Sequence, residues 1–160
     1  MAERSVFETV LGNRFLELPA PLRELHAPGS KFTASGTARV DGTEGWIARL
    51  AAVVFGFPRA AEQVAVTVRI ESGAGWERWT RDFSGKRFSS VVSASSVPGR
   101  LVERFGVFSF ELSLIVGASG VLGMPVLGWR LGPLPMPGWL APVSVAAEEA
   151  DTEGRFRFDV

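Results

Sequence analysis

The residues best suited to chemistry alternate along one short stretch of the chain: Glu77, Trp79, Arg81 and Phe83. Side chains two residues apart point to the same face of a β-strand. A face that carries an indole, a guanidinium and a phenyl group can line a pocket, because the arginine holds an anionic group while the rings cover an apolar body. The same pattern also allows a structural interpretation, in which Arg81 pairs across strands with Glu103 on the solvent side.

Glu103 and Arg104 are sequence neighbours in a stretch with strand character, so one of the two side chains faces inward. An inward charge needs a partner, and Arg81, Arg130 or Asp159 could provide it. A buried ion pair with no ligand is the alternative interpretation. The residues that we assign to a candidate ligand-binding site are Trp79, Arg81, Glu103, Trp129 and Arg130.

Most catalytic chemistries are excluded by residue types that the chain lacks. Its 160 residues contain one histidine, His26, and neither cysteine nor tyrosine. There is therefore no thiolate nucleophile, no disulfide framework and no Cys/His zinc site. We interpret His26 as a helix-terminal side chain facing the last carbonyl groups. Acid–base catalysis would need Asp82, Glu103 or Asp159 in a pocket, but no spacing singles out a carboxylate pair. We predict no catalytic residues, no metal and no cofactor.

The glycine-rich segment 117–123 is similar to a phosphate-binding loop only at first sight. Met124 and Pro125 follow it where a helix should begin, and no βαβ unit with an acidic residue about 20 positions later is present. We therefore predict a hairpin turn between two strands.

Charge and hydropathy patterns limit the possible partners. Seventeen basic and 17 acidic residues cancel, and a nucleic-acid-binding protein normally has a basic excess. The start of the chain leads into an amphipathic helix without an apolar signal core, so we expect a cytoplasmic protein. Residues 112–129 form an uncharged run of 18, but glycines and Pro125 interrupt it. We predict short buried strands there, and no membrane span.

The elements that position these residues follow from period and capping signals. Ser5 and Glu8 form a capping box at the start of a first helix, and Pro19 or Pro21 opens a second one. A strand is predicted over residues 31–40. A nearly apolar helix is predicted over about 43–55, where it could act as a lid. From residue 62 the apolar period is two, with strands predicted at 62–70, 76–83, 87–92, 101–105, 108–116, 121–131, 143–148 and 155–160.

This order predicts one α+β domain over residues 1–160. Its helical part spans about 5–57 and its antiparallel β meander about 62–160. We expect the N-terminal helices to pack on a strongly curved antiparallel sheet, and a meander of this length can close into a barrel.

The chain resembles a bacterial family catalogued as domain of unknown function 4166. The resemblance runs over nearly the whole chain, through the segments Phe7–Gly12, Leu22–His26, Gly36–Val40, Phe55–Pro58, Trp79–Gly85, Val102–Gly106, Gly128–Arg130 and Gly154–Val160. In that family a basic-aromatic strand usually follows the last segment, and its absence here implies a sheet that is incomplete or that closes differently. Members also occur fused behind a dinucleotide-binding, oxidoreductase-like domain, which implies an accessory or ligand-related role without catalytic residues.

Three functions remain. The first is a non-catalytic module that holds an apolar or amphipathic small molecule in the cup of the sheet. The second is an interaction domain that docks to an oxidoreductase-like protein through the uncharged segment 131–147, which predicts an exposed apolar patch. The third is an enzyme that uses Glu103 or Asp82 with an arginine.

Overall fold

The computed structural model describes residues 4–40, 61–140, 145–150 and 156–159, with side chains described for 4–36 and 65–139. The chain begins with three short helices: α1 (Val6–Leu11), the 3-10 helix η1 (Gly12–Glu17) and α2 (Ala20–Leu25). The predicted capping box is confirmed, since the Ser5 hydroxyl accepts from the Glu8 N–H at 3.1 Å and the Ser5 N–H donates to the Glu8 carboxylate at 2.9 Å. Of the two prolines predicted to open the second helix, Pro19 is the residue before α2 and Pro21 lies in its first turn, where its fixed φ suits a helix start.

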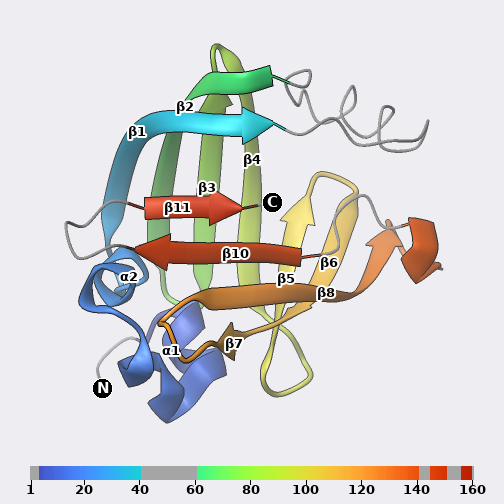
Figure 1. Cartoon of the computed structure of the whole chain (residues 1–160). Coiled ribbons are helices and arrows are strands. Elements are labelled where there is room, and N and C mark those ends of the chain that lie inside the picture. The colour runs from blue at the N-terminus through green and yellow to red at the C-terminus, as the bar shows by residue number, and fades with distance from the viewer. Residues whose placement is uncertain (1–3, 41–60, 141–144, 151–155, 160) are drawn as a thin grey trace.

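The rest of the described chain is one antiparallel sheet (Figure 1). Its strands are β1 (Lys31–Val40), β2 (Ala61–Gly73), β3 (Trp76–Phe83), β4 (Lys86–Ala94), β5 (Arg100–Phe105), β6 (Phe108–Ser113), β7 (Ile115–Val116), β8 (Leu122–Leu131), β9 (Leu134–Met136), β10 (Val145–Ala150) and β11 (Phe156–Asp159). A second 3-10 helix, η2 (Gly138–Leu140), follows β9. Neighbours in the sheet run β1-β2-β3-β4-β5-β6-β8-β10-β11, with β7 and β9 both paired to β8. This arrangement confirms the predicted meander.

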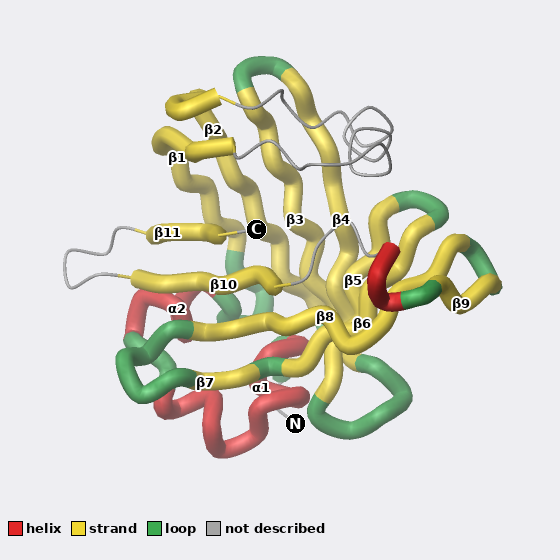
Figure 2. The backbone as a smooth tube through the Cα atoms, turned by 45° about the vertical axis from the view of Figure 1, so that its right-hand side comes forward, coloured by secondary structure: helices red, strands yellow, loops and turns green. Residues whose placement is uncertain are grey.

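The sheet bends strongly but does not close into a barrel. Figures 1 and 2 show that it wraps round so that β10 and β11 face β2, β3 and β4. The path of hydrogen-bonded strands nevertheless ends at β1 on one side and β11 on the other. Eight antiparallel pairings separate these two strands, so β1 and β11 run in the same direction and their antiparallel pairing is impossible. Among the described strands β1 and β11 also form no parallel pair, so the expectation of closure into a barrel is wrong, while the predicted curved antiparallel sheet is confirmed.

The helices cover one end of the curved sheet, at the bottom of Figure 1. Their apolar side chains join those of the sheet in one core, which includes Phe7, Leu22, Ile70, Leu101 and Leu122, all at most 1% exposed. We call the side of the sheet that carries these core residues the inner face. The opposite side, the outer face, carries serine, threonine and charged residues, as the period of two requires.

Two further predictions concern the glycine-rich segment 117–123 and the segment 43–55. The glycine-rich segment forms the tight turn between β7 and β8, with the Gly117 N–H donating to the Val121 carbonyl at 2.8 Å, so the predicted hairpin is confirmed. The predicted helix over 43–55, and with it the possible lid, lies outside the described residues. In the part of the chain that is described, no helix has the length and apolar character needed to cross a bilayer.

Candidate functional site

The register of the central strands brings sequence-distant inner-face residues into one band. Arg81 of β3 lies opposite Phe88 of β4, and Glu103 of β5 lies opposite Phe110 of β6. Phe110 in turn lies opposite Trp129 of β8. Because directly opposed residues of an antiparallel pair share a face, these side chains all lie on the inner face.

A continuous series of aromatic rings crosses this band, and we call it the aromatic row. Successive ring centroids lie 5.7, 6.3, 5.8 and 6.2 Å apart, which is within the range of favourable aromatic contact. The row consists of Phe83, Phe88, Phe105, Phe110 and Trp129. Phe110 and Trp129 are buried, whereas the first three rings keep part of their surface exposed. The row therefore runs from the core to a partly uncovered surface.

Arg81 lies on this aromatic surface and is held by four groups. Its guanidinium carbon is 5.0 Å from the centre of the Trp79 ring and 5.5 Å from that of Phe88, which are cation–π distances. It donates to the Ser90 hydroxyl at 3.1 Å and pairs with the Glu103 carboxylate at 3.5 Å. The sequence allowed this pair either on the solvent side or with Glu103 facing inward, and the structure has the inward arrangement, with Arg81 as the partner rather than Arg130.

Glu103 has fewer partners than Arg81. Its Oε1 atom is buried and accepts no hydrogen bond, because the contact with Arg81 is an ion pair without hydrogen-bond geometry. The Glu103 side chain is 15% exposed and that of Arg81 is 16% exposed. The two charges therefore compensate each other near the surface of an otherwise apolar band.

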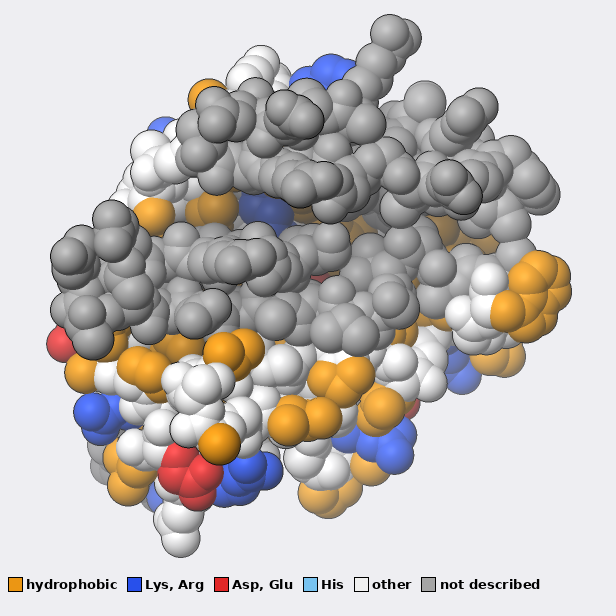
Figure 3. All heavy atoms as spheres, in the orientation of Figure 1, with side chains coloured by type: hydrophobic (Ala, Val, Ile, Leu, Met, Phe, Trp, Pro, Cys, Tyr) orange, Lys and Arg blue, Asp and Glu red, His pale blue; other side chains and the backbone are white. Residues whose placement is uncertain are grey.

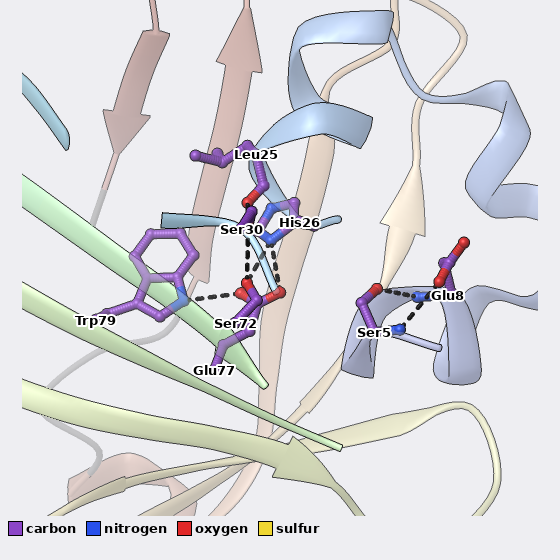
Figure 4. Close-up of polar contacts among 8 residues, drawn as sticks. All are labelled: Ser5, Glu8, Leu25, His26, Ser30, Ser72, Glu77 and Trp79. Atoms are coloured by element: carbon purple, nitrogen blue, oxygen red, sulfur yellow. Dashed lines mark hydrogen bonds and ion pairs between the residues drawn. The ribbon is translucent and has the colours of Figure 1, made fainter. Parts of the chain in front are cut away.

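One step deeper lies a fully buried network that joins the helices to β3 (Figure 4). The His26 Nδ1 atom is 3.0 and 3.2 Å from the two oxygens of Glu77, and the Trp79 indole N–H donates to Glu77 at 3.1 Å. The Phe7 ring stacks on the imidazole with centroids 3.7 Å apart. Both His26 and Glu77 are completely buried.

This network corrects our interpretation of His26. His26 ends α2, as expected, but its ring points into the core toward the Glu77 carboxylate and not toward the last carbonyl groups. The sequence held a signal for this contact, because Glu77 shares the inner face with Trp79 and an inward carboxylate requires a partner. The network also connects to the site, since Glu77 holds the indole on which Arg81 lies.

The structure brings together four of the five assigned site residues. Trp79 contacts Arg81, and Arg81 pairs with Glu103. Trp129 belongs to the aromatic row, and its indole N–H donates to the Pro137 carbonyl at 2.9 Å. Arg130 does not join them. It lies opposite Ser109 on the outer face and is exposed, because adjacent residues of a strand point to opposite sides.

The other candidate residues lie elsewhere. Asp82 is on the outer face, where its carboxylate accepts from the Gly85 N–H at 2.8 Å and pairs with Arg87 at 3.3 Å. Its role in the described structure is to shape the β3–β4 turn. The side chain of Asp159 lies outside the described ones. Among the described residues, no group of three histidine, aspartate or glutamate side chains is arranged to hold a metal ion.

Exposed apolar side chains also gather at one end of the sheet, and we call this surface the outer patch because it lies beyond the core. By strand register its Leu131 and Leu134 lie on the inner face, in line with Phe108. Val107, Leu134 and Trp139 are 63%, 62% and 83% exposed, and Leu131 is 38% exposed. The Gly132 N–H donates to the Val107 carbonyl at 2.7 Å, which holds the β8–β9 turn against the β5–β6 turn. Hydrophobic side chains stand out at the right edge of Figure 3, where Figure 1 places η2. The first part of the segment 131–147 is therefore exposed and apolar, as the docking hypothesis predicts.

Comparison with known proteins gives a family and nothing closer. Neither the curated proteins nor the solved structures include a significant match to this chain. The model of one family, described as domain of unknown function (DUF4166), matches residues 18–160. This match covers α2 and all the strands from β1 to β11, so the chain belongs to the DUF4166 family.

Proposed function

We propose that this protein is a non-catalytic module that holds an apolar or amphipathic small molecule against the aromatic row. The observation that carries the proposal is the incomplete burial of Phe83, Phe88 and Phe105 on the inner face, beside the charged pair of Arg81 and Glu103. A filled core would bury these rings, because aromatic side chains contribute most of their stabilising free energy when they leave water. Ligand pockets typically combine such rings with a few polar groups.

The inner face carries a second property of a binding surface. The charged pair is fixed in position by the ring contacts of Arg81 and by its hydrogen bond to Ser90. Polar groups that are already ordered lose little further conformational entropy when a ligand arrives.

The test is a titration of the protein with N-phenyl-1-naphthylamine, an uncharged dye whose fluorescence rises in apolar surroundings. We expect saturable binding, weakened about tenfold by Phe88→Ala, since one lost aromatic contact is worth about 1 to 1.5 kcal/mol. Phe83→Ala should act in the same direction. Leu134→Ala, which removes an equally apolar side chain from the outer patch, is the matched control and should leave binding unchanged.

The alternative is a protein-interaction domain that docks to an oxidoreductase-like partner. The exposure of Trp139 and Leu134 favours it, because a contiguous exposed apolar surface is typical of interaction sites. The same titration separates the two proposals. If Leu134→Ala weakens dye binding and Phe88→Ala does not, the dye reports the outer patch, and the small-molecule proposal is abandoned in favour of docking. The form of the enzyme hypothesis that uses Asp82 is dropped, because that carboxylate accepts a hydrogen bond in the β3–β4 turn.

A further inference from the structure

The chemistry of the polar pair indicates what kind of ligand the inner face would take. Arg81 already has a counter-charge, because the Glu103 carboxylate lies 3.5 Å from its guanidinium, while two rings lie on it and one of its N–H groups donates to Ser90. An anionic ligand would have to displace Glu103 from it or remain beside a like charge. Either event costs free energy in a partly buried site.

Glu103 is the group that lacks partners. A carboxylate has about four lone-pair positions for hydrogen bonds, yet the described structure gives Glu103 only the ion pair with Arg81 and no hydrogen bond. A buried acceptor without a donor is destabilising. A ligand that supplies an O–H or N–H group would therefore relieve a deficit that the protein already has.

The charge balance argues further for an uncharged donor. The pair is neutral as a whole, so a cationic head would be attracted to Glu103 and repelled by Arg81 at nearly the same distance. Lys86 is the competing feature: it lies opposite Phe83 at the end of the β3–β4 hairpin and is exposed, so it could attract an anion to the rim.

We propose that the polar end of the ligand is an uncharged hydrogen-bond donor, such as a hydroxyl group, which donates to the Glu103 carboxylate while an apolar ring system lies on the aromatic row. This inference rests on the proposed function and adds the chemical class of the ligand. Trp79, held by Glu77, fixes the position of Arg81 and so of the acceptor.

The experiment compares four compounds that share one naphthalene body in displacement of N-phenyl-1-naphthylamine. They are 2-naphthalenemethanol, its methyl ether, 2-naphthoate and 2-naphthylmethylammonium. We expect the alcohol to displace the dye at a concentration about tenfold lower than each of the others, as one hydrogen bond to a charged acceptor predicts. In Glu103→Gln, which leaves Arg81 without a counterion, 2-naphthoate should gain about tenfold. Glu111→Gln breaks an ion pair with Arg100, 3.2 Å apart on the outer face, and is the matched control.

The outcomes separate this inference from the proposed function. If the alcohol and its ether displace the dye equally, or if the ammonium compound is best, the cup binds ligands but the uncharged-donor inference is wrong. If 2-naphthoate is best in the unmodified protein and Lys86→Gln abolishes that preference, the rim lysine anchors an anion and the inference is overturned. If the dye itself does not bind, the proposed function fails and the inference fails with it.

Discussion

At the residue scale, the fully buried contact between His26 and Glu77 joins the end of α2 to strand β3. A buried carboxylate is tolerated only when hydrogen-bond donors contact it. Here the His26 imidazole and the Trp79 indole N–H both contact Glu77. The stacked Phe7 ring excludes water from the other side of the imidazole. The orientation of Trp79, and through it that of Arg81, therefore depends on a residue that the ligand would never contact.

Glu77→Ala should lower the free energy of unfolding by about 3 kcal/mol, because it leaves two buried donor groups without their carboxylate. The measurement is urea denaturation followed by tryptophan fluorescence. Glu71→Ala, an exposed glutamate on neighbouring β2, is the control and should change stability by less than about 0.5 kcal/mol. The double variant His26→Leu with Glu77→Leu should recover at least half of the loss, since an apolar pair needs no counter-charge. Equal costs for Glu77→Ala and Glu71→Ala would contradict the role given to the network.

At the element scale, the β7–β8 hairpin is fitted against the start of α2. Gly120 has φ +79°, a conformation that suits glycine, and a Cβ there would lie 2.8 Å from the Pro19 Cγ atom. Gly132, in the β8–β9 turn, has φ +56° with no atom within 4 Å of an added Cβ. Both glycines have a positive φ, but only Gly120 has a neighbouring residue close to the position of an added Cβ. Comparing the two therefore isolates the contact between the hairpin and α2.

Gly132→Ala should cost about 1 kcal/mol of stability from backbone strain alone, whereas Gly120→Ala should cost about 1–3 kcal/mol more because of the clash with Pro19. Urea unfolding of the two variants measures the difference. Adding Pro19→Ala to Gly120→Ala should recover part of the extra cost. If the two glycine variants lose the same stability, the hairpin does not pack on α2 in solution.

At the scale of the whole molecule, β1 forms one end of the path of described strands, and this free end separates the described sheet from a barrel. Ser72 N–H donates to the Ser30 carbonyl at 3.0 Å, and opposed residues of an antiparallel pair alternate between bonded and non-bonded positions. The N–H groups of Phe32, Ala34 and Gly36 therefore point to β2. Those of the residues between them point away from the sheet.

Amide hydrogen exchange followed by NMR should show this alternation. We expect Thr33 and Ser35 to exchange at least about tenfold faster than Ala34, because an amide hydrogen-bonded within the sheet exchanges only when the structure opens. Thr80, in central strand β3, is the slow reference. Equal protection at Thr33, Ala34 and Ser35 would mean that a further strand or a partner covers the edge of β1.

The sequence by itself determined the faces of the strands and most of their positions, because capping, turn and period signals act between residues close along the chain. The capping box of Ser5 with Glu8 and the inward alternation from Glu77 to Phe83 are such cases. It also contained the reason to exclude Arg130, since a neighbour of the inward Trp129 must face outward. It did not predict β9, and it merged β6 and β7 into one strand.

Only the tertiary structure decided which partners meet. Glu103 pairs with Arg81 across an intervening strand, and His26 meets a carboxylate 51 positions away. Both contacts depend on strand register and helix docking, which sum many weak long-range interactions that no local pattern encodes. The open sheet has the same origin: among the described strands β1 and β11 stand at the two ends of the path without pairing, and whether such ends meet depends on the twist and curvature accumulated over the whole sheet.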